Sequence, residues 1–218
     1  MSSAEASSVA LQVDDASAFV NENPLLAVGL LVGAVVLIAL LLLAFGRLRR
    51  TRGQKLATLL GRYDDIAVLM HPNPDPDAMS AALGVQELAD SVDTDTEIYY
   101  PGQIRHQENR AFETVLDLDF SRIESAADLP DAPVVLVDHN EPRGFSGSDS
   151  VDPIAVIDHH PGGGEGKEFT DVRTDNGACA SIFAEYFEEM GWETVDPDEV
   201  ETLDDDEEVL PPPVATGL

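Results

Sequence analysis

Three short apolar runs in this sequence each lead directly into a cluster of aspartate and histidine, and this recurrence constrains the fold more than any other feature. The runs and their clusters are IAVLM (66–70) before HPNPDPD (71–77), VVLV (134–137) before DHN (138–140), and IAVI (154–157) before DHH (158–160). Continuous apolar runs of this length, set between helical patterns, are typical of parallel strands covered on both faces. The sequence therefore predicts an α/β fold, a parallel sheet with helices on both faces.

The segments between the apolar runs support this assignment. We expect helices over DAMSAALGVQELAD (77–90), ENRAFETVLDL (108–118) and GACASIFAEYFEEMG (177–191), and a further strand over TEIYY (96–100). The acidic, proline-punctuated stretch from residue 195 to 213 is expected to be a solvated loop.

The three clusters are predicted to form one site. The carboxyl ends of parallel strands lie along one edge of a sheet, so polar residues that follow three such strands come together. Helix-capping aspartates and locally bonded loop histidines are the alternative interpretation. Three clusters in the same position after a strand favour a single site, which would hold four of the five histidines of the chain.

Carboxylate and imidazole ligands without thiolate suit Mn²⁺ or Mg²⁺, and are compatible with Zn²⁺ or Co²⁺. Several carboxylates at one edge imply two divalent ions, and we expect both to be Mn²⁺. Two ions ~4 Å apart promote in-line phosphoryl displacement. The prolines of the first cluster would stiffen its loop so that His71, Asp75 and Asp77 point at the metals. The single cysteine, Cys179, excludes an internal disulfide and a cysteine-based zinc site.

An uncharged apolar run, PLLAVGLLVGAVVLIALLLLAFG (24–46), precedes this region. As a helix it would extend ~35 Å, enough to cross a hydrocarbon core of ~30 Å. A cleaved signal peptide would carry its positive charge before a shorter run, whereas RLRRTRGQK (47–55) follows this one with five of the twelve basic residues. The positive-inside rule places that end in the cytoplasm and the N-terminus outside.

These patterns divide the chain into a disordered acidic segment (1–23), a transmembrane helix (24–46) that anchors it in the cell membrane, a basic linker (47–59) and a cytoplasmic catalytic domain (60–218). The composition, with 42 acidic against 12 basic residues and a net charge of −30, indicates adaptation to molar salt, as in a halophilic archaeon. An acidic interaction tail is the alternative, but the acidic residues are spread over the chain. This charge argues against binding of long duplex nucleic acid.

HPNPDPDA, VDHN and DHH, in this order and followed by GACAS, resemble the DHH phosphoesterase family over roughly residues 60–218. That family includes RecJ-type nucleases, nanoRNase and pAp phosphatases, cyclic-dinucleotide phosphodiesterases and family II inorganic pyrophosphatases. The resemblance implies that His71 and Asp75 bind one metal, that Asp77 and His159 bind the other, and that Asp138 bridges both.

The resemblance also implies roles around the metals. His160 would touch the substrate phosphate, and Asp158, Asn73 and His139 would support the ligands from behind. The turn at Gly177 and Ala178 would present a helix N-terminus to phosphate, unless it serves only close packing of the helix start. The segment RHQENRAF (105–112) is expected to be a surface helix, with basic contacts to substrate as the alternative.

The implied function is a membrane-anchored phosphoesterase that hydrolyses small nucleotides, namely cyclic di-AMP, pApA and other short oligoribonucleotides, or pAp, with a water activated by two metals. Association of two copies of the chain into a homodimer is a further expectation that the sequence leaves open. A family II-like inorganic pyrophosphatase is the alternative, since VDHNE resembles that branch, although Pro161 stands where the branch has a basic residue. A non-catalytic nucleotide or metal sensor is a third reading, because the family's fourth motif and C-terminal domain find no match, so that we expect either a fragment or a natural truncation.

Overall fold

The computed structural model describes residues 22–48, 50–194 and 209–218. The expected disordered segment, except for its last two residues, and most of the expected acidic loop lie outside the described residues. The chain forms two compact units, residues 1–50 and residues 51–218.

The first unit contains the helix α2 (Pro24–Leu48), which includes the predicted apolar helix. Its stretch Pro24–Leu42 has a mean hydropathy of 3.1 and is not buried. By length and composition this stretch can cross a membrane, and a signal sequence near an N-terminus would have the same properties. The membrane anchor therefore stays a prediction.

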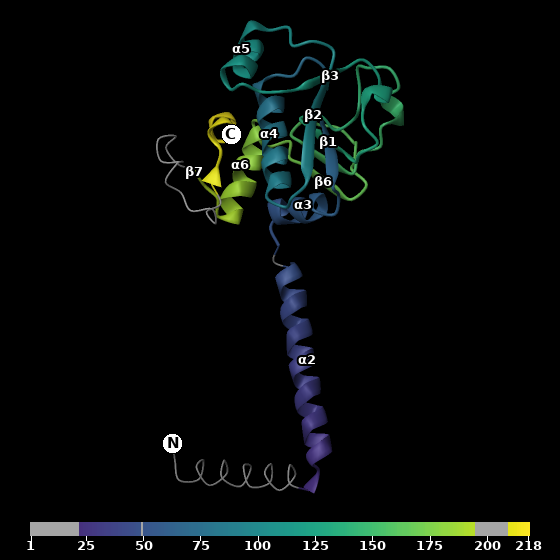
Figure 1. Cartoon of the computed structure of the whole chain (residues 1–218), viewed down its shortest axis with the longest axis vertical. Helices are drawn as coiled ribbons and strands as arrows, with labels where there is room; N and C mark the ends of the chain where they lie inside the picture. The colour runs from purple at the N-terminus through teal and green to yellow at the C-terminus, as the bar shows by residue number, and fades with distance from the viewer. Residues whose placement is uncertain (1–21, 49, 195–208) are drawn as a thin grey trace. The chain divides into compact units, whose positions relative to one another are not determined.

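The second unit is built on a six-stranded sheet in which every strand pair is parallel (Figure 1). The strand order is β3-β2-β1-β4-β5-β6. The strands are β1 (Asp65–Leu69), β2 (Asp95–Pro101), β3 (Ser121–Ile123), β4 (Val134–Val137), β5 (Ala155–Asp158) and β6 (Phe169–Val172). The predicted parallel sheet and its α/β class are confirmed.

The helices gather on one face of this sheet. They are α3 (Arg52–Leu60), α4 (Pro76–Asp90), α6 (Cys179–Met190) and α7 (Pro212–Gly217), and they share a core with alternate residues of the central strands such as Ile66, Val68 and Val135. The helix α5 (Gln107–Val115) follows β2, and the short pair β7 (Glu193–Thr194) and β8 (Val209–Leu210) precedes α7.

The other face buries the intervening strand residues, such as Ala67, Leu69 and Leu136. Leu129 and Val151 pack on it from the ends of two short 3-10 helices, η1 (Ala126–Asp128) and η2 (Ser148–Ser150). The expectation of helices on both faces thus takes an uneven form, with α-helices on one face and loops with these 3-10 turns on the other.

The helices α4 and α6 pack closely against each other beside the three clusters. A methyl group on Gly84 of α4 would lie 2.7 Å from the ring of Phe183 on α6, so the absence of a side chain lets the helices approach closely. Both helices begin at the carboxyl edge of the sheet, where the three clusters lie.

Candidate metal centre

The three clusters converge because β1, β4 and β5 are neighbours in the sheet. Leu69 pairs with Leu136, and Val137 pairs with Ile157, so the strands end at nearly the same level. Nε2 of His71 lies 3.2 Å from Oδ2 of Asp138. Residues from three separate strand ends are thus brought to one place, as the apolar runs predicted.

Asp138 is the centre of the arrangement. Its side chain is 3% exposed, and its φ of 60° is a left-handed conformation that non-glycine residues seldom adopt. Its Oδ1 is buried and has no hydrogen-bond partner in the part of the chain that the structure describes. Burial, together with the negative charges of Asp77 and Asp75, raises the pKa of this carboxyl above its ordinary value.

His71 and Asp75 lie on one side of Asp138, and ligand atoms of the three residues are all within 4.8 Å of one another. Nδ1 of His71 lies 3.0 Å from the carbonyl oxygen of Pro72, and since a carbonyl only accepts, Nδ1 donates there while Nε2 faces Asp138. Burial works to lower the pKa of His71, but the hydrogen bond with Asp138 and the Pro72 carbonyl raise it above its ordinary value.

His159 lies on the other side of Asp138, with Nε2 at 3.3 Å from Oδ1 of Asp138 and 3.4 Å from Oδ2 of Asp77. Its Nδ1 is 3.3 Å from the carbonyl oxygen of Asn176, so that Nε2 is the nitrogen that faces the two carboxylates. Ligand atoms of Asp138, His159 and His160 form a second group within 4.8 Å. Asp138 therefore belongs to both groups.

Asp77 is held in a way that its sequence position does not reveal. Its carboxylate accepts hydrogen bonds from the backbone N–H groups of Cys179, at 2.8 Å, and Ala180, at 2.7 Å. The residue before α6, Ala178, offers no side-chain cap, so Asp77 caps that helix from a distant part of the chain.

Asp158 is fully buried and organises the DHH cluster. Its Oδ1 accepts hydrogen bonds from the backbone N–H groups of His159 and His160 and lies 2.9 Å from Nδ1 of His160. Its Oδ2 accepts a 2.8 Å hydrogen bond from Nδ2 of Asn140. Asn140 links the second and third clusters, a role that the sequence analysis did not give it, although its place in DHN beside Asp138 was the available signal.

The remaining predicted residues surround this core. His139 is buried with Nδ1 at 2.9 Å from the carbonyl of Val137, and burial is the main reason that its pKa falls to about 4, so the ring is neutral. Asn73 turns its Oδ1 toward the backbone N–H of Arg105, at 2.7 Å. Asn73 thus supports the shape of the loop through the residues that follow β2.

The turn before α6 contacts the site through its backbone. The first N–H groups of that helix are engaged by Asp77, and the phosphate-binding role of Gly177 and Ala178 stays a prediction. Burial raises the pKa of the Cys179 thiol well above its ordinary value, and its Sγ faces the carbonyl of Ile157. A thiol in this state is a poor nucleophile or metal ligand.

The residues fit a divalent cation. Carboxylates lie close to an oxygen of Asp138 that is buried and accepts no hydrogen bond from the described residues, and the Nε2 atoms of His71 and His159 face the same carboxylate. A cation between them would offset the burial and the charge repulsion that raise the pKa of Asp138. Oxygen and imidazole donors of this kind suit Mn²⁺ and related ions, and no thiolate of the described residues joins them.

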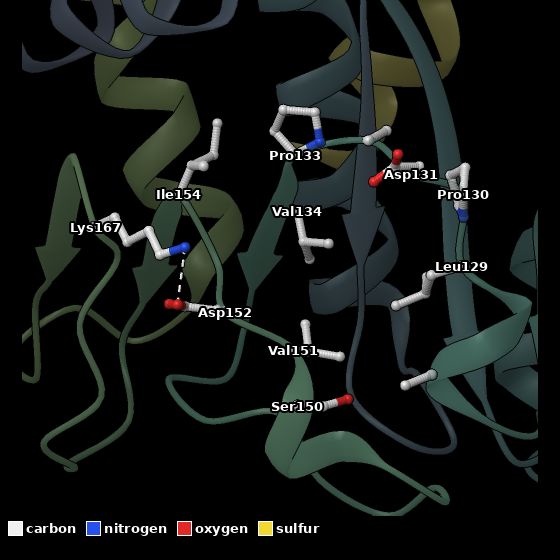
Figure 2. A pocket seen from close by; sticks show the side chains of 12 residues that line it. Leu129, Pro130, Asp131, Pro133, Val134, Ser150, Val151, Asp152, Ile154 and Lys167 are labelled. Atoms are coloured by element: carbon white, nitrogen blue, oxygen red, sulfur yellow. Dashed lines mark ion pairs between the residues drawn. The ribbon is translucent and has the colours of Figure 1, made fainter.

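A pocket at the opposite edge of the sheet does not belong to this centre. Figure 2 shows Val134, at the start of β4, and Ile154, just before β5, so the pocket lies at the amino ends of these strands. Lys167 and Asp152 form a 2.8 Å ion pair in it. Its volume is ≈ 420 Å³, and its lining contains none of the residues of the metal centre.

Residues 65–208 of the chain match the DHH family, N-terminal domain. An uncharacterised protein of Methanocaldococcus jannaschii is 31% identical over 144 residues, which are 66% of this chain and 28% of that protein. A probable manganese-dependent inorganic pyrophosphatase of Shouchella clausii is 35% identical over 91 residues, which are 41% of this chain and 29% of that protein. The chain thus spans less than a third of the length of these relatives.

Among solved structures, an exopolyphosphatase-related protein from Bacteroides fragilis resembles the chain with a TM-score of 0.45 and 19% identity. The similarity covers 64% of this chain and 44% of that protein.

Proposed function

The chain belongs to the DHH family, and we propose that it is a membrane-anchored, metal-dependent phosphoesterase that hydrolyses small nucleotides such as cyclic di-AMP, pApA or pAp. The observation that carries this proposal is the place of Asp138 in two ligand groups at once. A carboxylate shared in this way, with one buried oxygen that accepts no hydrogen bond from the described residues, supports a pair of cations rather than a structural ion pair.

The ligands for one divalent ion would be His71, Asp75 and Asp138, and those for the other Asp77, His159 and Asp138. Ions held there would supply positive charge and Lewis acidity for a phosphate group. We propose Mn²⁺ as the metal, on the donor set and on the manganese named in the pyrophosphatase relatives.

The protein itself would orient the reacting groups. Nδ1 of His160 is bonded to the buried Asp158, so Nε2 is the nitrogen that meets a substrate oxygen, and the ring is half exposed. In hydrolysis an oxygen of water forms a bond to phosphorus, and the bond from phosphorus to the leaving oxygen breaks. We propose that His160 holds the phosphate in line for that displacement and that Asp158 keeps the imidazole in the required tautomer.

The anchor would be α2, with the catalytic unit in the cytoplasm. The length and hydropathy of Pro24–Leu42 support it, as do the arginines that follow the helix. Such an anchor suits an enzyme whose small nucleotide substrates diffuse to it.

Inorganic pyrophosphatase is the second candidate, because relatives in several bacteria carry that name. Pro161, where that branch has a basic residue, weighs against it. A third candidate is a sensor that binds nucleotide or metal without turnover.

Turnover separates the three. The full chain in detergent, with Mn²⁺ in molar KCl, is assayed on cyclic di-AMP, pApA, pAp and pyrophosphate. Hydrolysis of a nucleotide in preference to pyrophosphate is expected, and preference for pyrophosphate would support the second candidate. Nucleotide binding without product would favour the sensor and contradict the proposed activity.

A further inference from the structure

The basic side chains of the catalytic unit are used unevenly. Four of them are ion-paired with carboxylates in the described residues, namely Arg62, Arg122, Lys167 and Arg173. Arg52 and Lys55, on α3, and Arg110, on α5, also form no ion pair with the described residues, although Arg52 donates to the carbonyl of Thr170 and Arg110 to the carbonyls of Ile104 and Arg105. Arg105 and Arg143 are exposed and form no ion pair with any described residue, in a chain with 42 acidic residues. A lack of available carboxylates does not explain two unpaired arginines in such a chain.

Both arginines stand on loops that hold the first cluster from either side. The backbone N–H of Arg105 donates to Oδ1 of Asn73 at 2.7 Å. Gly144, next to Arg143, lies so close to Pro72 that an added methyl group would be 2.3 Å from its Cγ. Arg105 and Arg143 therefore flank the loop that carries His71 and Asp75.

The loop that carries Arg105 is braced from behind. The guanidinium of Arg110 donates to the carbonyls of Ile104, at 3.1 Å, and Arg105, at 2.5 Å. The buried amide of Asn109 donates to the carbonyl of Pro74 at 2.9 Å. A backbone that is already fixed reduces the cost of ordering the loop when Arg105 binds an anion.

The loop that carries Arg143 is held by its neighbour. Gly144 has a φ of +83°, which favours glycine, and it packs on Pro72.

The arginines lie across the centre from His160. They flank the loop that follows β1, whereas His160 follows β5, and β4 lies between these strands. Neighbouring strands are ~4.8 Å apart, so the ends of β1 and β5 are separated by roughly 10 Å. An anion at the arginines is then a different group from the phosphate at His160.

We propose that Arg105 and Arg143 bind a second anionic group of the substrate, so that the site selects nucleotides whose two phosphates are separated by a ribose. The inference rests on the proposed function and narrows it. The phosphorus atoms of pyrophosphate share one bridging oxygen and are too close together to reach both places. Guanidinium groups suit the task because they bind phosphate through two N–H groups at once.

The test compares a substrate with two phosphates and a substrate with one. KM and kcat of the full chain are measured for pApA and for bis(p-nitrophenyl) phosphate, with Mn²⁺ in molar KCl. Arg105→Gln and Arg143→Gln are each expected to raise KM for pApA about tenfold, the size of a lost charge-assisted hydrogen bond. In both variants kcat for pApA, and all constants for bis(p-nitrophenyl) phosphate, should stay within about twofold of wild type.

Arg122, on β3, is exposed but ion-paired with Glu124, the residue that follows the strand. Arg122→Gln is therefore the matched control. This substitution should leave KM and kcat for both substrates unchanged. The Debye length in molar salt is ~3 Å, so an effect that survives there reports direct contact rather than long-range attraction. Equal losses on both substrates, or no loss on either, would overturn the inference.

If the chain does not turn over these substrates, the proposed activity is contradicted. The inference about the two arginines is then tested by nucleotide binding. Calorimetry then compares pAp with AMP in the same buffer with Mn²⁺. The two substitutions should weaken the binding of pAp about tenfold and leave the affinity for AMP unchanged. Equal affinities of wild type and variants for pAp, or no binding of pAp by wild type, would overturn it. Turnover of pApA that is insensitive to both arginines would leave the phosphoesterase standing without this site.

Discussion

The carboxylate of Asp77 accepts the backbone N–H of Cys179, 102 positions further along the chain, and so joins the start of α4 to the start of α6. The same carboxylate faces His159 in the metal centre. One side chain thus caps a helix with no cap of its own and faces the candidate metal centre. The folding of α6 and the geometry of the metal centre are therefore expected to depend on each other.

Replacement of Asp77 tests this double role. Asp77→Ala removes two hydrogen bonds to a charged group and is expected to cost about 2 kcal/mol of unfolding free energy without metal. Asp75→Ala removes one capping bond to Ala78 on α4 and should cost about 1 kcal/mol. Urea unfolding in EDTA measures both. Equal losses in the two variants would contradict the special role of Asp77.

The close approach of α4 and α6 predicts the effect of Gly84→Ala. The added methyl group would lie 2.7 Å from the ring of Phe183, and both residues are buried. Overpacking of this kind costs about 1–3 kcal/mol. The helices would separate and Asp77 would shift, so weaker Mn²⁺ binding should accompany the lower unfolding midpoint.

Gly163→Ala is the control for that change, since a methyl group at Gly163 meets nothing within 4 Å. A stability of Gly84→Ala within about 0.5 kcal/mol of this control would show that the helices can adjust.

Two substitutions of Asp138 separate its charge from its backbone. Its φ of 60° suits asparagine better than alanine, so metal-free Asp138→Ala should be about 1 kcal/mol less stable than Asp138→Asn. The asparagine also removes a buried, crowded charge, and metal-free Asp138→Asn should be no less stable than wild type. Both variants should lose activity and the stabilisation by Mn²⁺, which thermal unfolding with and without the metal would measure.

His106→Ala is the control, because His106 is exposed, precedes α5 and faces Glu108 rather than the metal centre. It should keep the activity and the Mn²⁺ response of wild type. Equal losses in the His106 and Asp138 variants would contradict the site.

Glu87, on α4, gives a pH-dependent prediction away from the centre. Burial, with the nearby charge of Asp90, raises its pKa from 4.5 to about 7. Between these values the unfolded chain releases a proton that the folded chain keeps, so this group lowers stability as the pH rises. The side chain is half-buried, and with solvent screening the cost at neutral pH is about 1 kcal/mol.

Glu87→Gln should therefore stabilise the protein by about 1 kcal/mol at about pH 8 and by less at about pH 5. Urea unfolding at the two pH values measures the difference from wild type. Glu189→Gln, at an exposed position of α6, should give no such trend. A gain from Glu87→Gln that does not grow with pH would refute the assignment.

The anchor is tested by charge in α2. Gly33→Arg with Leu37→Arg places two charges near the middle of the apolar stretch, where each costs about 3 kcal/mol for insertion. Cell fractionation should then recover most of the chain outside the membrane fraction. Gly33→Ala with Leu37→Ala should leave it in the membrane, and equal fractionation of both pairs would contradict the anchor.

Local patterns were enough to predict the sheet, because its central strands are apolar runs that end in polar clusters. They did not reveal β3 and β6. Ser121–Ile123 is too short for a pattern, and β6 contains Asp171, whose carboxylate is buried because Arg173 and the Tyr186 hydroxyl bond to it. A buried carboxylate with distant partners looks like a loop residue in the sequence.

The convergence of the clusters could be predicted for the same reason, since neighbouring parallel strands end together. The supporting contacts could not. The hydrogen bond that the backbone N–H of Arg105 donates to Asn73, and the carbonyl of Asn176 beside His159, depend on how loops fold over the edge of the sheet. Such contacts follow from tertiary packing and have no period in the sequence.

The most direct test of the central claim is to measure the binding of Mn²⁺ to the metal-free full chain in molar KCl. Calorimetry gives the number of ions, and electron paramagnetic resonance shows whether they are coupled. We predict two ions for each chain, with the spin coupling expected of ions that share the Asp138 carboxylate, and loss of that coupling in Asp138→Ala. Binding of no Mn²⁺, or of ions that are uncoupled and unaffected by Asp138→Ala, would contradict the account.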